Sequence, residues 1–452
     1  MKGLISAILL ATTPALLAAS AAPALAAEVT PADLEKAVAQ DWSTYLAPLY
    51  DHFHRNPELS TVEVNTAARM AKELRAVKGM EVTEKVGGTG VVGVLKNGPG
   101  PVILLRADMD GLPVEEKSGL ANASKVRQKD RDGIEQPVMH ACGHDTHITG
   151  LVGTARQLAA LKDKWSGTVI FVAQPAEEIV GGAKKMMADN LYQRFGKPDY
   201  AIGWHVTSAL PTGTIGLADG VTYSAADTVD IVVPGIGAHG ASPQSGKDPV
   251  FIASDIVQSL QGFIGREIAP LKPAVITVGA FHAGSKHNII SDRADLSVTV
   301  RADDLETRDK LIEGIKRIAV QTGRKWGLPE DKLPVVTVRE DERAIPNIND
   351  TELTRRLHAT YAKAYGDTIF TTVKRDSMGA EDFPYLVGPG VKGVYYNVGG
   401  TPQAAFDAAK AGGPAVPSHH SPLFKVDGEA AVKLGTQTMT LAVLDLAAKP
   451  AS

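Results

Sequence analysis

The feature that most constrains this chain is a set of near-continuous apolar runs that each lead into acidic or histidine side chains. Residues 167–175 read GTVIFVAQP and are followed by Glu177 and Glu178, and residues 102–110 read VILLRADMD. A third run, YAIGWHV over 200–206, holds a histidine near its end. Apolar runs of this kind are typical of parallel strands that are covered on both faces. Because ligands bind beyond the carboxyl ends of such strands, we expect these polar side chains at one shared crevice.

The length and the net charge of the chain indicate how many domains it forms and which class of partner it binds. A chain of 452 residues that is 44% hydrophobic exceeds the roughly 250 to 300 residues at which a single core stops growing, so we expect two domains. Lys and Arg number 47 against 51 Asp and Glu, which leaves a net charge of -4. This balance offers no basic surface for nucleic acid or anionic lipid, and a small molecule is the expected partner.

The middle of the chain has a different pattern from its two ends. The expected order there is β-α-β-β-α-β, with strands over 227–233, 274–282, 294–302 and 334–340 and helices over 248–265 and 306–323. That order suits a small α+β domain inserted into a larger one. We therefore predict an α/β fold in which residues 28–222 and 345–452 form the larger domain and residues 223–344 form the inserted one. The larger domain should hold a mixed, mostly parallel sheet covered by helices, including helices over 31–54, 60–77, 146–161, 351–365 and 428–447.

The first 26 residues have the composition of a secretory signal peptide. Lys2 precedes an apolar run that ends in the small residues Ala24-Leu25-Ala26. We expect cleavage near this point, a periplasmic or secreted mature chain, and no membrane contact after cleavage. Cys142 is the only cysteine, so it cannot form an internal disulfide in an oxidising compartment and needs another role.

The stretch VMHACGHDTH over 138–147 supports more than one chemistry. Cys142 and His144 can face one ion across Gly143, and a mixed thiolate, imidazole and carboxylate site suits zinc, manganese or cobalt. Alternatively, Cys142 could be a nucleophile activated by a neighbouring histidine. The adjacent pair Glu177-Glu178 favours the metal, because one carboxylate can bind it while the other acts as general base to a water molecule.

Five motifs in order along the chain resemble the M20 metallopeptidase family, and more narrowly its cysteine-containing amidohydrolase branch. They are RADMDGLP at 106–113, HACGHDTH at 140–147, QPAEE at 174–178, GAHGASP at 237–243 and MGAEDF at 378–383. That branch includes hippurate hydrolases, N-acyl-amino-acid hydrolases and plant auxin-conjugate hydrolases.

The resemblance implies a role for individual residues. The implied ligands of two divalent ions are Cys142, His144, Glu178, His205 and His420, with the thiolate as a bridge between the ions. Glu177 would be the general base, and Asp110 would support a ligand from behind. His419 competes with His420, because the doubled histidine leaves the register ambiguous.

The resemblance also assigns roles around the substrate. It implies that residues 28–222 and 345–452 are the catalytic domain and that the inserted residues 223–344 are its lid. His239 of the lid would stabilise the oxyanion, Asn288 and Arg301 would meet the substrate's carboxylate or backbone, and Gly379 would lie beside the substrate. Such lids commonly dimerise, so we expect a homodimer or a higher homo-oligomer. The implied activity is hydrolysis of N-acyl amino acids or related amides. A carboxypeptidase or dipeptidase is the alternative within enzymes, and a non-catalytic binding protein is the alternative outside them.

Overall fold

The computed structural model describes residues 29–372 and 374–449. The predicted signal peptide over residues 1–26 lies outside this range. Among the helices that are described, none combines the length and the apolar character that a membrane crossing requires.

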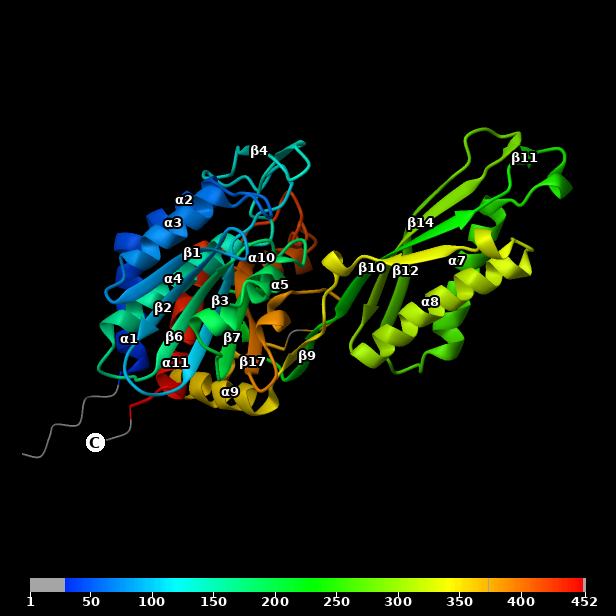
Figure 1. Ribbon diagram of the computed structural model, residues 1–452. Helices are drawn as coiled ribbons and strands as arrows, with labels where there is room; N and C mark the ends of the chain where they lie inside the picture. Colours follow the sequence, from blue (N-terminus) through cyan, green and yellow to red (C-terminus); the bar gives the residue numbers. More distant parts are fainter. Residues whose placement is uncertain (1–28, 373, 450–452) are drawn as a thin grey trace, which may run out of the picture.

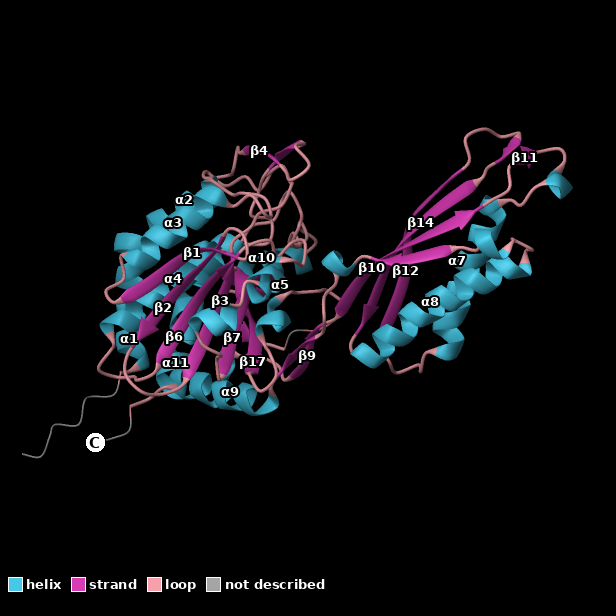
Figure 2. Cartoon of the chain, viewed as in Figure 1, coloured by secondary structure: helices cyan, strands magenta, loops and turns pink. Residues whose placement is uncertain are grey.

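The larger part of the molecule is built on a seven-stranded sheet with the order β1-β2-β6-β3-β7-β17-β8 (Figures 1 and 2). Its strands are β1 (Met80–Val86), β2 (Gly90–Lys96), β6 (Thr168–Gln174), β3 (Val102–Asp108), β7 (Tyr200–Pro211), β17 (Lys392–Thr401) and β8 (Ile215–Gly216). The central four strands, β6, β3, β7 and β17, run parallel to one another, and the outer strands are antiparallel. The predicted mixed, mostly parallel sheet is confirmed.

Helices cover both faces of this sheet. The first face packs on α1 (Pro31–Asp41), α2 (Ala47–Arg55), α3 (Val64–Arg75), α4 (His144–Ala160), α9 (Thr351–Tyr365) and α11 (Gly428–Leu446), and the second packs on α5 (Gly182–Ala188) and α6 (Leu191–Phe195). Alternation along β6 shows why its sequence is apolar throughout. Val169 and Phe171 enter the core of the first face, whereas Ile170 and Val172 enter the core of the second. The helix expected over 31–54 is instead two helices joined by a π-helical turn, Trp42–Leu46.

The inserted segment forms a second, antiparallel sheet with the order β12-β14-β10-β15 and its own core. Its elements are β10 (Ala225–Pro234), β11 (Ala238–His239), α7 (Pro249–Glu267), β12 (Ala274–Ala283), β13 (Ile289–Ile290), β14 (Arg293–Ala302), α8 (Leu305–Lys325) and β15 (Val335–Val338). The long elements occur in the predicted order β-α-β-β-α-β. Figure 1 shows this small unit beside the large sheet, joined to it through a narrow region near β9.

Two chain segments cross between the units, and they pair with each other there. Strand β9 (Gly220–Tyr223) lies antiparallel to β16 (Asn347–Asn349). Ala226 and Ala344 form a further bridge just inside the small unit. The remaining elements of the large unit are a surface hairpin of β4 (Arg127–Lys129) and β5 (Glu135–Pro137), and the short helix α10 (Gln403–Lys410).

Candidate metal centre

The carboxyl ends of the central strands carry the predicted site. Strand β3 ends at Asp108, β6 leads into Glu177 and Glu178, and β7 carries His205. Asp110 lies just beyond β3 and touches two predicted ligands: its carboxylate accepts from the backbone N–H of Glu178 at 3.0 Å, and its backbone carbonyl lies 2.9 Å from Nδ1 of His144. Asp110 therefore contacts both His144 and Glu178, which is the position that a supporting residue would need.

Gly143 allows the chain to turn sharply between Cys142 and His144. Its φ of 83° is in the left-handed region, and an added Cβ would lie 2.4 Å from Cγ1 of Val206. Only glycine meets both conditions without strain. Helix α4 starts directly afterwards at His144, so the thiol and the imidazole leave the turn beside each other.

A second tight turn presents the two glutamates. Ala176 has a φ of 52°, unusual for a residue with a side chain, and its carbonyl accepts from the backbone N–H groups of Gly181 and Gly182. An added Cβ on Gly182 would lie 1.6 Å from the oxygen of Pro175. This compact turn holds Glu177 and Glu178 next to His144 Nε2, at 3.9 and 3.8 Å.

The free edge of β7 determines how two of the histidines are protonated. Strand β3 pairs with β7 only as far as Gly203, so the backbone of Val206 meets no strand on that side. Its carbonyl accepts a hydrogen bond from the Nδ1–H of His205 at 2.6 Å, and its N–H donates to Nε2 of His147 at 2.9 Å. The Nε2 lone pair of His205 is therefore left to bind a metal ion. This nitrogen lies 3.5 Å from the Cys142 sulfur.

His144 and His147 differ in whether a ring nitrogen is left to bind a metal ion. The Nδ1–H of His144 donates a hydrogen bond to the Asp110 carbonyl. Its buried Nε2 has no hydrogen-bond partner among the described residues. His147 has no free nitrogen, because Nδ1 lies 2.5 Å from Asp108 and Nε2 accepts from Val206. A neutral histidine that binds a metal usually donates its other N–H to a carbonyl or carboxylate, which His144 does. His147 instead orients Asp108.

The potential ligand atoms gather in overlapping groups, each with its atoms within 4.8 Å of one another. One group is Cys142, Glu178 and His420, a second is His144, Glu177 and Glu178, and a third joins Asp108 to His144, His147 and His205. Within the part of the chain that the structure describes, His144 Nε2 and Glu178 Oε1 are buried without a hydrogen-bond partner. Orphaned buried acceptors of this kind are costly unless something binds them, and a cation fits this donor set.

The charge balance of the site points to the same conclusion. Burial raises the pKa of Glu178 to about 8, with the carboxylates of Asp110 and Asp108 adding to the effect. Burial also raises the pKa of Glu177 and of the Cys142 thiol well above their usual ranges, and the neighbouring carboxylates contribute to both shifts. Burial alone would lower the pKa of His144, but Asp108, Asp110 and Glu178 raise it to about 10. The chain thus surrounds this space with excess negative charge that protons or metal ions must balance.

The two C-terminal histidines occupy different places. His420, with a φ of 64°, places Nε2 3.4 Å from Glu178 and is partly exposed. His419 is half-buried; its Nε2 accepts from the backbone N–H of Ser208 at 3.3 Å, and its Nδ1 lies 3.7 Å from the Cys142 sulfur.

A buried arginine beneath the site is a feature that the sequence reasoning missed. Arg106, one of the largest fully buried side chains, donates to Asp108 at 2.7 Å, to Glu381 at 2.7 Å and to Asp382 at 3.1 Å. Glu381 and Asp382 also form a carboxylate group with Glu177. The motifs RADMD and MGAEDF contain these residues, but Arg106 and Glu381 are 275 positions apart, and the sequence does not reveal that they form one ion cluster.

The predicted lid residues lie away from these ligands. Figure 1 places β11, which contains His239, at the end of the small unit far from the large sheet. Asn288 is exposed beside it, with its carbonyl accepting from Gly240, and Arg301 on β14 donates only to the neighbouring carbonyl of Val300. Gly379 lies at the junction of the two units, where its carbonyl accepts from the Ser224 N–H.

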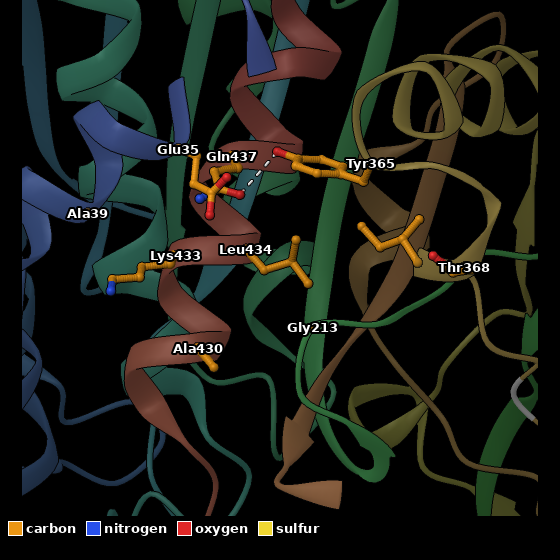
Figure 3. Close-up of a pocket in the computed structure, with 10 residues that line it drawn as sticks. Glu35, Ala39, Gly213, Tyr365, Thr368, Ala430, Lys433, Leu434 and Gln437 are labelled. Atoms are coloured by element: carbon orange, nitrogen blue, oxygen red, sulfur yellow. Dashed lines mark hydrogen bonds between the residues drawn. The ribbon is translucent and has the colours of Figure 1, made fainter. Parts of the chain in front are cut away.

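A separate cavity of about 380 Å³ lies between α1, α9 and α11 (Figure 3). Glu35, Tyr365 and Gln437 line it, and the Tyr365 hydroxyl donates to Gln437 at 3.1 Å. It shares no residue with the ligand groups above, and it is therefore not the predicted site.

Comparison with known proteins identifies the family. A sequence profile of the peptidase family M20/M25/M40 matches residues 104–442. The chain belongs to that family. It is 36% identical over 365 residues to thermostable carboxypeptidase 2 of Saccharolobus solfataricus, covering 80% of this chain and 86% of the relative. It is 40% identical over 297 residues to a hippurate hydrolase of Campylobacter jejuni, covering 64% of this chain and 73% of the relative.

A solved structure supports the same family. A protein of Bacillus subtilis, described as a dinuclear metal-binding peptidase of the M20 family, superimposes with a TM-score of 0.72 and 27% identity, covering 90% of this chain and 99% of its own. The M20 resemblance and the amidohydrolase branch that the motifs predicted are confirmed. The chain is a metal-dependent hydrolase that acts on amide bonds, so the non-catalytic alternative is wrong.

Proposed function

We propose that this M20 hydrolase is an exported binuclear enzyme that cleaves the amide bond of N-acyl amino acids or short peptides with a free carboxylate. One observation carries the proposal. The buried Nε2 of His144 and Oε1 of Glu178, which have no hydrogen-bond partner among the described residues, lie in one group of potential ligand atoms with a second glutamate, Glu177. The hippurate hydrolase and the dinuclear relative support the substrate class and the number of ions.

The donor set suits two divalent ions of borderline softness, such as zinc, manganese or cobalt. We assign Cys142, His144, Glu178, His205 and His420 as the residues that would hold the ions. When bound, the ions supply Lewis-acid polarisation of the scissile carbonyl and acidify a water molecule.

The residues of the chain supply the proton transfers. Glu177 takes the proton from the attacking water and delivers it to the leaving amine. Burial and the carboxylates of Glu381 and Glu178 raise its pKa, which favours the protonated form that donates to the leaving amine. Asp110 keeps His144 and Glu178 in place during these steps.

The thiol-nucleophile alternative fits the site poorly. A cysteine nucleophile needs a lowered pKa, and here burial and the carboxylates of Glu178 and Glu177 raise the pKa of Cys142. Two neighbouring glutamates next to the sulfur oppose thiolate formation unless a cation is bound.

The small unit must approach the site for its predicted roles. His239 would stabilise the oxyanion, and Asn288 and Arg301 would hold the substrate's carboxylate. Because β11 lies far from the large sheet (Figure 1), this needs either closure of the small unit or the small unit of a second copy in a homodimer. His239→Ala should lower kcat while leaving the metal content unchanged, and loss of metal from that variant would contradict the assignment.

Adjacent glutamates provide the decisive test. Glu177→Gln should keep both ions and lower kcat by about 10²- to 10⁴-fold, since a positioned base contributes that much. Glu178→Gln is the matched control, and it should lose metal. Metal content by elemental analysis and hydrolysis of N-benzoyl and N-acetyl amino acids measure the two effects. Near-normal turnover in Glu177→Gln would rule out this base.

A carboxypeptidase or dipeptidase is the second candidate, favoured by the 36% identity to a thermostable carboxypeptidase. Comparing kcat/KM for N-acyl amino acids, dipeptides and longer peptides separates the two activities. Export is tested independently by determining the N-terminus of the mature chain, which we expect near Ala26.

A further inference from the structure

His419 is a half-buried imidazole for which the proposed ligand set has no role. Its ring lies 5.3 Å from the ring of His205 and 4.7 Å from that of Phe424. Both of its nitrogens have partners, the Ser208 N–H on one side and the Cys142 sulfur on the other.

The backbone of β7 determines which nitrogen carries the proton. Ser208 follows Val206 by two residues, so their N–H groups point to the same side of the strand, beyond the end of β3. Each N–H donates to the Nε2 of a histidine, His147 in one case and His419 in the other. An Nε2 that accepts a hydrogen bond has no proton, so the proton of the His419 ring is on Nδ1. That N–H faces the Cys142 sulfur at 3.7 Å.

We propose that His419 is a positioning residue whose Nδ1–H donates a hydrogen bond to the Cys142 thiolate, while His420 binds metal. The inference rests on the proposed function, in which the Cys142 thiolate is a metal ligand. The hydrogen bond orients the sulfur and withdraws electron density from it, which sets how much charge the thiolate gives to the ions. The doubled histidine at 419 and 420 thus divides into one donor to a ligand and one ligand.

Two amide substitutions separate the two hydrogen bonds of His419. In His419→Asn, the side-chain NH₂ takes the place of Nδ1 and can donate to the sulfur, but it cannot reach the Ser208 N–H. In His419→Gln, the longer side chain takes the place of Nε2 and can accept from Ser208, but it offers no donor at Nδ1. A role in packing alone predicts no difference of this kind between the two variants.

The readout is the thiolate-to-cobalt charge-transfer band of the protein loaded with Co²⁺, together with the cobalt content. His419→Gln should keep two ions per chain, shift the band to longer wavelength and bind cobalt about 10- to 100-fold more weakly, a range typical for loss of such a partner. His419→Asn should keep the band near its wild-type position. His420→Ala should lose an ion.

The outcomes distinguish the inference from the proposed function. An unchanged band in His419→Gln, or equal shifts in both variants, would overturn the role of His419 alone. Loss of an ion from both His419 variants, with two ions retained in His420→Ala, would make His419 the ligand and overturn the inference. A wild-type protein without a thiolate band would overturn the proposed metal site, and this inference with it.

Discussion

At the scale of single residues, backbone groups rather than sequence neighbours decide what each imidazole can do. His144 and His147 are three residues apart on one helix, yet only His144 keeps a free Nε2. The difference arises because the carbonyl of Asp110 meets one ring and the N–H of Val206 meets the other. Val206 lies about 60 residues away from both, so the distinction depends on tertiary structure.

Arg106 has the clearest effect on stability among the buried charges. Arg106→Met would leave Asp108, Glu381 and Asp382 without their cation, and removing one partner of a buried ion pair costs about 3 to 5 kcal/mol. We expect the free energy of unfolding in urea to fall by this amount, together with weaker metal retention, because Asp108 lies in one group of potential ligand atoms with His144 and His205.

A buried pair in the small unit is the control for Arg106. Arg308 donates to Asp227 at 2.8 Å, and both side chains are almost fully buried. Arg308→Met should also destabilise the protein but leave metal content unchanged. Equal metal loss in the two variants would mean that the effect of Arg106 is not local to the site.

The reactivity of Cys142 is also a residue-scale property. Burial and the carboxylates of Glu178 and Glu177 raise its pKa, so the thiol of the metal-free chain stays protonated at neutral pH. We expect iodoacetamide to label chelated protein more slowly than free cysteine at neutral pH, with the rate rising as the pH passes the ordinary thiol range. Metal should slow labelling further at every pH. Fast labelling of the chelated protein at neutral pH, measured by mass spectrometry, would contradict this environment.

At the scale of elements, the site depends on how β7 and α4 approach each other. Gly143 at the start of α4 touches Val206, so Gly143→Ala adds a clash to the strain of a positive φ. Gly133 has a similar φ of 80° with nothing within 4 Å of an added Cβ, and Gly133→Ala therefore isolates the backbone term. In both variants the left-handed conformation should lower the free energy of unfolding by about 1 to 2 kcal/mol. In Gly143→Ala, overpacking should lower it by about 1 to 3 kcal/mol more. Equal unfolding free energies for the two variants in urea would show that α4 can shift away from β7.

The sequence predicted best the strands with a clear hydrophobic pattern, either continuous or alternating. The apolar run of β6 and the alternating strand β10 were expected over 167–175 and 227–233 and occur at Thr168–Gln174 and Ala225–Pro234. Strand β1 was missed because MEVTEKV is an edge strand with mostly half-exposed side chains and a pairing irregularity between Thr83 and Val86. An edge strand buries few side chains on either face, so its sequence shows no clear hydrophobic pattern.

The residues of the site also divide into those that the sequence predicted and those that it did not. The residues at strand ends were predictable, because the carboxyl edge of a parallel sheet gathers whatever side chains end its strands. The ion cluster of Arg106 with Glu381 and the hydrogen bond of His419 to Cys142 were not predictable. They depend on pairs of side chains that no sequence period connects.

At the scale of the whole molecule, two separate hydrophobic cores divide the chain. The core of the small unit contains only residues between Val229 and Val338, and all of the proposed ligands lie in the large unit. A segment of this size with its own core can fold by itself. Metal binding should therefore stabilise one unit and not the other.

This division predicts two thermal transitions with different responses to metal. A ligand that binds only the native state at 100 times its Kd adds about 2.7 kcal/mol, so Zn²⁺ or Co²⁺ should raise the Tm of the large unit alone. The isolated segment 223–344 should fold cooperatively, and its Tm should match the transition of the full chain that metal leaves unchanged. Calorimetry of both proteins, with and without chelator, makes the comparison. A single transition that shifts as a whole would mean that the β9–β16 junction couples the two cores into one folding unit, and that metal at the large sheet also governs the small unit.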